Sequence, residues 1–214
     1  MRVKICGITN LDDATAAADS GADFVGLIFA ASARQVNVET AIGVMEGLPA
    51  PTLPVLLFRN TPLDEVDRTI AATGGRWVQF HGREPVDYLR EVVARHPHTR
   101  IIRAWEVTDP SSGSALREYL EEAAAAGVGI DIVILDAPKG GPHPGYECLA
   151  EVSCACDKRP PAIWCAGGLT PGNLRSAVDR GRYDGVDVAS GIELRPGVKE
   201  HAALRAFIET ARQL

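Results

Sequence analysis

Two residues with acid or base side chains end short apolar runs that indicate buried strands. Cys6 ends the run Val3-Lys4-Ile5-Cys6, and Asp136 follows Ile132-Val133-Ile134-Leu135. A thiolate can remove a proton from carbon and a carboxyl group can donate one, so the pair could perform acid and base catalysis. Cys6 has a structural alternative, because free cysteine is among the most buried residue types. Asp136 is harder to explain in that way, because an unpaired carboxylate on a buried strand is costly.

Four other strand ends carry groups suited to binding a polar or anionic ligand. Arg34 lies in the loop after the second apolar run, and His81 ends the fourth. Gly167-Gly168 and Ser190-Gly191 follow the last two runs, where glycines let backbone amides approach an anion closely. We predict phosphate binding by these two pairs and substrate binding by Arg34 and His81. The alternatives are a tight turn at Gly167-Gly168, a solvated Arg34, and a His81 that pairs with a neighbouring loop.

Composition indicates one soluble globular domain over residues 1–214, since 46% of the residues are hydrophobic, 23% are charged and no shift in composition divides the chain. The net charge of -6 and the lack of a long basic run argue against nucleic acid or an anionic membrane as the main partner. No apolar segment reaches the roughly 18 residues of a membrane span, and no signal peptide is evident. We therefore expect a cytoplasmic protein.

The cysteines do not form a recognisable disulfide framework or metal site. There are five of them, an odd number. Cys148, Cys154 and Cys156, with Cys165 further on, lack the paired C-x2-C spacing that shapes a tetrahedral zinc site. We predict no metal.

Short apolar runs alternate with helix-length segments along the whole chain. This alternation is typical of strand-helix units. We expect one strand ending at Cys6 and further strands over 24–29, 53–58, 77–81, 100–104, 130–135, 162–166 and 185–189. We expect helices over 11–20, 37–48, 61–72, 85–94, 114–126, 171–180 and 202–213.

Eight strand-helix units in a chain of this length predict a closed parallel (β/α)8 barrel, the TIM barrel. In such barrels the active site lies at the carboxyl ends of the strands, where the candidate residues stand, and the last two strand ends frequently bind phosphate. An open doubly wound sheet is the alternative, because alternation alone does not establish closure. No G-x-G-x-x-G follows the first strand, which weakens the dinucleotide-binding version of that sheet.

With these motifs in place, the chain resembles the phosphoribosylanthranilate isomerase family of tryptophan biosynthesis. The resemblance runs nearly end to end, and its first and last stretches are the most specific. It is carried by Val3-Lys4-Ile5-Cys6-Gly7-Ile8-Thr9, Gly21-Ala22-Asp23-Phe24-Val25-Gly26, Val78-Gln79-Phe80-His81-Gly82, Leu135-Asp136-Ala137, Ala166-Gly167-Gly168-Leu169 and Gly185-Val186-Asp187-Val188-Ala189-Ser190-Gly191-Ile192-Glu193.

The resemblance implies an Amadori rearrangement of N-(5-phosphoribosyl)anthranilate, a small phosphosugar, without cofactor or metal. By analogy Asp136 would protonate the furanose ring oxygen, and Cys6, as thiolate, would remove the proton from C2. Arg34 would pair with the anthranilate carboxylate, and Asp187 would orient sugar hydroxyls or the loop. Lys4 should share the facing of Cys6 on its strand, and a nearby positive charge can lower the pKa of a thiol. The resemblance also implies that this protein is a monomer or a homodimer.

Two departures from the family pattern leave other functions open. Ser32-Ala33-Arg34 lacks the proline usual in that loop, and Gly140 to Gly145 carries prolines where the family has a glycine-rich turn. The proline residues remove backbone donors and stiffen the loop. The alternatives are altered phosphosugar specificity, as in a related isomerase of histidine biosynthesis, and a paralogue that binds a phosphosugar without turnover. The histidine enzyme would be expected to carry an aspartate where Cys6 stands, and a metal-dependent epimerase fits less well.

Overall fold

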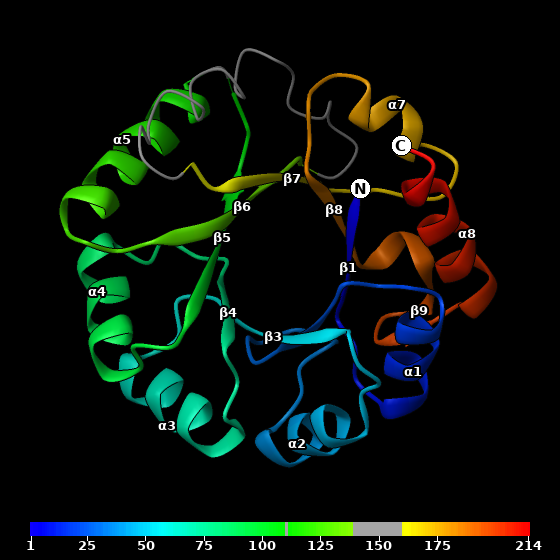
Figure 1. The fold of residues 1–214 in the computed structure, drawn as a ribbon, viewed down its shortest axis with the longest axis horizontal. Helices are drawn as coiled ribbons and strands as arrows, with labels where there is room; N and C mark the ends of the chain where they lie inside the picture. The colour runs from blue at the N-terminus through cyan, green and yellow to red at the C-terminus, as the bar shows by residue number, and fades with distance from the viewer. Residues whose placement is uncertain (110, 139–159) are drawn as a thin grey trace.

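Eight parallel strands form a closed barrel in the computed structural model, which describes residues 1–109, 111–138 and 160–214. The helices lie outside the ring of strands (Figure 1). The barrel strands are β1 (Arg2–Cys6), β2 (Phe24–Ile28), β3 (Leu53–Phe58), β4 (Trp77–Phe80), β5 (Arg100–Glu106), β6 (Ile130–Asp136), β7 (Ala162–Ala166) and β8 (Gly185–Val188). The helices are α1 (Leu11–Asp19), α2 (Val38–Gly47), α3 (Leu63–Thr73), α4 (Val86–Arg95), α5 (Ser112–Ala125), α7 (Leu174–Val178) and α8 (His201–Arg212).

Closure of the barrel is made by β1, which pairs in parallel with both β2 and β8. Lys4 of β1 lies opposite Phe24 of β2 on one side and Asp187 of β8 on the other. The predicted TIM barrel is therefore confirmed, and the open doubly wound sheet is wrong. Closure also brings together the ends of the chain, because the amino group of Met1 donates to the carbonyl of Ala211 at 3.1 Å.

Aromatic and branched side chains fill the barrel interior. The Phe24 ring packs edge-on against Trp77 and Trp164, with ring centroids 4.9 and 5.6 Å away. Val55, Ile102, Ala104, Ile132, Ile134 and Ala166 complete this inner cluster, and a larger cluster lies between the strands and the helices. The barrel is thus a packed core whose polar groups gather at the strand ends.

The helix starts follow local capping rules. Asn10 and Asn37 accept hydrogen bonds from the backbone N–H groups of Asp13 and Thr40, each at 2.8 Å, and so begin α1 and α2. Helix α7 is shorter than predicted, since 171–180 was expected and only Leu174–Val178 is helical. Thr170 and Asn173 bond to each other's backbone N–H groups at 3.2 and 2.7 Å, the reciprocal pattern of a helix N-terminus, and the regular helix follows this turn.

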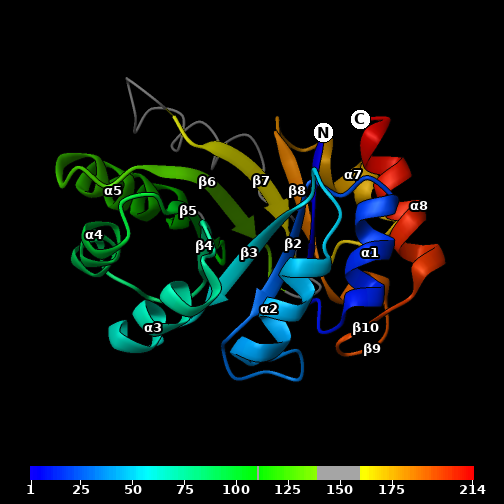
Figure 2. The same ribbon diagram turned by 60° about the horizontal axis from the view of Figure 1, so that its bottom comes forward.

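A short segment between β8 and α8 was not predicted. It contains a 3-10 turn (Ser190–Ile192) and a two-stranded hairpin made of β9 (Glu193–Arg195) and β10 (Val198–Lys199). Figure 2 shows this hairpin beside α1 and α8. The backbone N–H of Lys199 donates to Asp13 of α1 at 2.9 Å, which anchors the hairpin. Strands of two or three residues are too short to give a periodic pattern.

The helices of the described residues include none that is both long and apolar enough to cross a membrane. The departures at Gly140 to Gly145, and Cys148, Cys154 and Cys156, lie outside the described residues.

Candidate active site

One cavity of about 320 Å³ is lined by every site residue that the sequence predicted. It opens where the strands end at their carboxyl termini. The predicted residues are Cys6, Arg34, His81, Asp136, Gly167, Gly168, Asp187, Ser190 and Gly191. The sequence did not single out Arg59, a further cation in the lining. Residues from β1, β4, β6, β7 and β8 and their loops are thus brought to one place by barrel closure.

The Cys6 thiol lies beside a buried ion pair. The Lys4 ammonium group, with no solvent exposure, donates to both carboxylate oxygens of Asp187 at 3.0 Å each. Burial would lower the pKa of Lys4, but the charges of Asp187 and Cys6 outweigh it, so that pKa is raised and Lys4 is charged.

The pKa of Cys6 is raised above its ordinary value. Burial is the largest cause, and it outweighs the opposing effect of the Lys4 ammonium, while the Asp187 charge adds to the increase. Lys4 therefore shares the facing of Cys6, as its position on the strand predicted, and its charge lowers the pKa of the thiol by less than burial raises it. The side chain is only 6% exposed, and desolvation of a thiolate at that depth exceeds the Coulomb attraction.

Gly26 of β2 provides the space for this arrangement. A Cβ atom at Gly26 would lie 2.9 Å from the Cys6 sulfur, closer than real Cβ contacts, and 3.1 Å from the Lys4 nitrogen, which is tighter than most of them. Any side chain here would displace the thiol or the ammonium group. This requirement for a close approach could not be read from one sequence.

Asp136 lies against His81 at the ends of β6 and β4. Their Oδ2 and Nε2 atoms are 3.1 Å apart, and Nδ1 of His81 is 3.4 Å from the amide nitrogen of the buried Gln79. An imidazole with its proton on Nε2 satisfies both contacts, because it donates to Asp136 and accepts from Gln79. Asp136 was predicted from a buried strand, yet its side chain is 27% exposed to the cavity and is paired.

The guanidinium of Arg34 forms an ion pair with the carboxylate of Glu193 of β9. Its Nε lies 2.8 and 3.1 Å from the two carboxylate oxygens, and its Nη2 lies 2.7 Å from one of them. Gly7 makes room for the arginine stem, since a Cβ at this residue would lie 2.5 Å from the Arg34 Cδ. Glu193 belongs to the last motif that carries the family resemblance, but its pairing with Arg34 could not be predicted from that motif.

The two glycine-containing strand ends have backbones that only glycine fits. Gly167 and Gly168 have φ angles of 94° and 62°. A side chain at Gly167 would overlap the backbone of Ala137, and one at Gly191 would overlap the carbonyl oxygen of Leu169. Backbone atoms therefore line this part of the cavity, which suits the approach of an anion.

No cluster of three or more His, Cys, Asp or Glu side chains with metal-binding geometry occurs in the described part of the chain. The side chains that line the cavity include a thiol, two carboxyl groups, an imidazole and two guanidinium groups.

Fold and site together define a (β/α)8-barrel enzyme whose cavity, at the carboxyl ends of the strands, brings together a carboxyl group, a buried thiol and two glycine-containing loops. Residues 3–210 match the family model for N-(5'phosphoribosyl)anthranilate isomerase. The chain belongs to the N-(5'-phosphoribosyl)anthranilate isomerase family, an isomerase family of tryptophan biosynthesis, as the sequence motifs predicted.

Known proteins support this placement. The chain is 38% identical over 215 residues to the N-(5'-phosphoribosyl)anthranilate isomerase of Geobacter metallireducens, covering 99% of each chain. It is 37% identical over 213 residues to that of Rubrobacter xylanophilus, with 99% of this chain and 98% of the relative covered. A crystal structure of the dimeric Thermotoga maritima enzyme, in a form made monomeric, superimposes with a TM-score of 0.83, 32% identity and full coverage of both chains. A structure of a phosphoribosylanthranilate isomerase with reduced 1-(o-carboxyphenylamino)-1-deoxyribulose 5-phosphate also has a TM-score of 0.83, at 31% identity and full coverage.

Proposed function

We propose that this chain, acting as one barrel domain, converts N-(5-phosphoribosyl)anthranilate to 1-(2-carboxyphenylamino)-1-deoxyribulose 5-phosphate, with Asp136 as general acid and Cys6 as general base. The observation that carries the proposal is the shared cavity. This cavity of about 320 Å³ is lined by a thiol, a carboxyl group, Arg34 and the two glycine-containing loops. Its size suits one phosphosugar with an aromatic ring.

Asp136 begins the reaction. Protonated on Oδ1, it gives its proton to the furanose ring oxygen, so the C1–O bond breaks and the nitrogen lone pair forms a protonated Schiff base. His81 holds the other oxygen, Oδ2, at 3.1 Å and thereby orients the acid. This assigns His81 first to positioning Asp136 and second to substrate contact.

Cys6 completes the rearrangement. As thiolate it takes the proton from C2, and the electron pair of the C–H bond moves to form an enolamine. The enolamine loses its hydroxyl proton and gains a proton at C1, which leaves the ketone at C2. The cationic Schiff base adds positive charge to the cavity, which opposes the burial that raises the pKa of Cys6. The thiolate is then favoured at the stage that needs it.

The remaining cavity residues bind the substrate. Arg34 offers a planar guanidinium to the anthranilate carboxylate. Gly167-Gly168 and Ser190-Gly191 hold the phosphate through backbone amides. Both oxygens of Asp187 already accept from Lys4, so Asp187 sets the charge beside Cys6 and has only its remaining lone pairs for a sugar hydroxyl.

The solved relatives also support proposals for the ligand and the oligomeric state, and the biosynthetic role supports one for the cellular location. A related enzyme has been solved with a reduced form of this product, which supports a phosphosugar ligand here. The Thermotoga maritima relative is dimeric but exists as monomers too, so we propose a monomer or a homodimer. A biosynthetic isomerase without a membrane-crossing helix in its described residues is best placed in the cytoplasm.

The test is the loss of substrate fluorescence when freshly generated phosphoribosylanthranilate is added to the purified protein. Turnover faster than the spontaneous decay of the substrate, with the aminoketose as product, is expected. A folded protein that binds the reduced product analogue without turning over substrate would contradict the proposal and favour a binding role. Turnover of the aminoaldose phosphate of histidine biosynthesis alone would favour altered specificity.

A further inference from the structure

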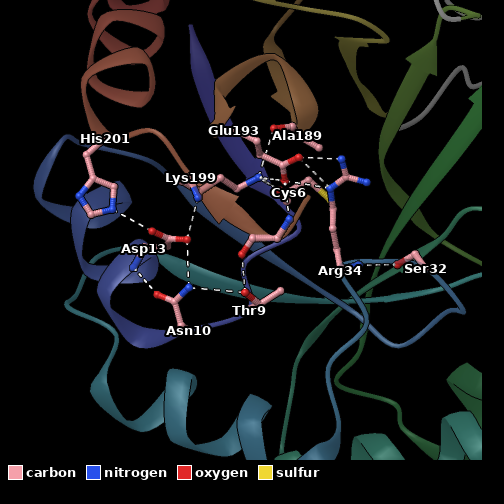
Figure 3. A network of polar contacts seen from close by, with 11 residues as sticks. Cys6, Thr9, Asn10, Asp13, Ser32, Arg34, Ala189, Glu193, Lys199 and His201 are labelled. Atoms are coloured by element: carbon pink, nitrogen blue, oxygen red, sulfur yellow. Dashed lines mark hydrogen bonds and ion pairs between the residues drawn. The ribbon is translucent and has the colours of Figure 1, made fainter. Parts of the chain in front are cut away.

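The hairpin of β9 and β10 carries two buried charges to which the reaction steps assign no role. The side chains of Glu193 and Lys199 are 4% and 0% exposed, and their charged atoms lie 2.9 Å apart. Figure 3 shows the Glu193 carboxylate between the ammonium group of Lys199 and the guanidinium of Arg34. Buried charges are costly unless each is paired, so their contacts indicate what they position.

Lys199 uses its three N–H donors within the protein. Its ammonium group donates to the Cys6 carbonyl at 2.6 Å, to the Ala189 carbonyl at 3.2 Å and to Glu193 at 2.9 Å (Figure 3). It therefore joins the ends of β1 and β8 to the Glu193 carboxylate. No donor remains on Lys199 for a substrate.

Arg34, in contrast, keeps one edge of its guanidinium for another anion. Glu193 occupies the edge made by Nε and Nη2, with distances of 2.7 to 3.1 Å. A guanidinium has five N–H donors, and the edge made by Nη1 and the outer N–H of Nη2 matches a second carboxylate. Nη1 makes no hydrogen bond to the residues that the structure describes, and Arg34 is the most exposed member of the cluster, with its side chain 23% exposed.

The charges agree with this assignment. Glu193 supplies one negative charge to two cations, Arg34 and Lys199. The cluster therefore has one uncompensated positive charge, and a single carboxylate bound to Arg34 would neutralise it.

We propose that Glu193 is a positioning residue that fixes the free edge of Arg34 toward the cavity and thereby makes the site selective for substrates with an ortho-carboxylate on the aryl ring. Lys199 holds the Glu193 carboxylate in the orientation that this needs. The inference rests on the proposed pairing of Arg34 with the anthranilate carboxylate and assigns Glu193 and Lys199 to that same site.

Binding of two probes tests the proposal. The first is reduced 1-(o-carboxyphenylamino)-1-deoxyribulose 5-phosphate, and the second is the same compound without the carboxyl group. Calorimetry gives the ratio of their dissociation constants, which measures what the carboxylate contributes. The wild-type protein should prefer the carboxylated probe by more than about tenfold, as a charge-assisted bidentate pair does. In Glu193→Gln this ratio should fall by about tenfold, while the affinity for the uncarboxylated probe stays unchanged.

Three further variants separate positioning from folding. Glu193→Asp keeps the charge beside Lys199 but draws it back from Arg34, so it should also lower the ratio in a protein of wild-type stability. An Arg34→Lys protein lacks the paired N–H donors of the guanidinium. In that protein Glu193→Gln should leave the ratio of the two dissociation constants unchanged. Glu209→Gln, an exposed change on α8, should behave as wild type in every measurement.

The outcomes are distinct. A wild-type ratio near one would overturn the pairing of Arg34 with the carboxylate, and this inference with it. A large wild-type ratio that persists in folded Glu193→Gln and Glu193→Asp would overturn the role of Glu193 alone. Equal weakening of both probes would show that Glu193 supports the cavity as a whole, and would also overturn the proposal.

Discussion

The Lys4 ammonium group donates to both carboxylate oxygens of Asp187, at 3.0 Å each, inside the barrel beside the Cys6 thiol. The two residues are 183 positions apart in sequence and meet only because β1 pairs with β8. Lys4 favours the thiolate of Cys6 and Asp187 disfavours it. Burial is the largest influence on the pKa of Cys6, and the two charges of the ion pair shift it in opposite directions.

Removing either member of this pair should change the reactivity of Cys6 in opposite directions. Lys4→Met should slow alkylation of Cys6 by iodoacetamide at pH 8, and Asp187→Asn should accelerate it, each by about tenfold for one unit of pKa. The rate is read on the peptide that contains Cys6, by mass spectrometry. Each single change leaves a buried charge unpaired and should cost about 3 kcal/mol of stability, whereas Lys4→Met with Asp187→Asn should recover most of it. Changes of the same sign in both single variants would contradict this account.

Gly26→Ala should impair catalysis by displacing the thiol. The added methyl group would lie 2.9 Å from the Cys6 sulfur and 3.1 Å from the Lys4 nitrogen. We expect kcat to fall by at least about tenfold, with a stability loss of about 1–3 kcal/mol from overpacking. Gly43→Ala on α2 is the matched control, since nothing lies within 4 Å of its added methyl group. It should keep full activity and gain about 0.5–1 kcal/mol. Equal activity in the two variants would show that the close approach at Gly26 is unimportant for turnover.

The pH dependence of Cys6 alkylation should show the raised pKa of this thiol. Burial, against the opposing charge of Lys4, raises this pKa above its ordinary value of 9.0, so the thiolate is a minor form at neutral pH. The rate of reaction with iodoacetamide, read on the peptide that contains Cys6, should therefore rise with pH from 7 to 9, approaching about tenfold per unit. Binding of the reduced product analogue over the same range is the control and should not rise in this way. A rate of alkylation that does not change over this range would contradict the raised pKa of Cys6.

Much of the fold and most of the site could be predicted from sequence, for physical reasons. The strands are buried on both faces, so each appears in the sequence as a short apolar run. The glycines after β7 and β8 could be recognised because the backbone there has positive φ angles or lies in close contact with another loop. The partners of charged residues could not be predicted. Glu193 meets Arg34, and Lys4 meets Asp187, only through barrel closure. The hairpin of β9 and β10 also escaped prediction, because its strands are shorter than one period of the pattern.

Acid should remove the stabilising effect of Glu193. Burial would raise the pKa of Glu193, but hydrogen bonds from Arg34 and Lys199 outweigh it and hold this pKa below its ordinary value of 4.5. The charged form is favoured in the folded state, so the stabilisation by the Glu193 carboxylate is present above pH 4.5 and is lost as the pH falls through the lower folded-state pKa. Urea unfolding should give a free energy of unfolding that is about 2 kcal/mol lower for Glu193→Gln than for wild type at pH 7. This difference in stability should become smaller below pH 4. Glu209→Gln should have nearly the same free energy of unfolding as wild type at both pH values. A loss of stability in Glu193→Gln that becomes larger in acid would contradict the lowered pKa of Glu193.

In the proposed mechanism Cys6 and Asp136 divide the proton transfers, so Cys6→Ser and Asp136→Asn should each abolish turnover. Both variants should remain folded and bind the reduced product analogue within about threefold of wild type, because neither change removes Arg34 or the glycine loops from the cavity. Their kcat values should fall by at least about a thousandfold. Near-normal turnover in either folded variant would contradict the account.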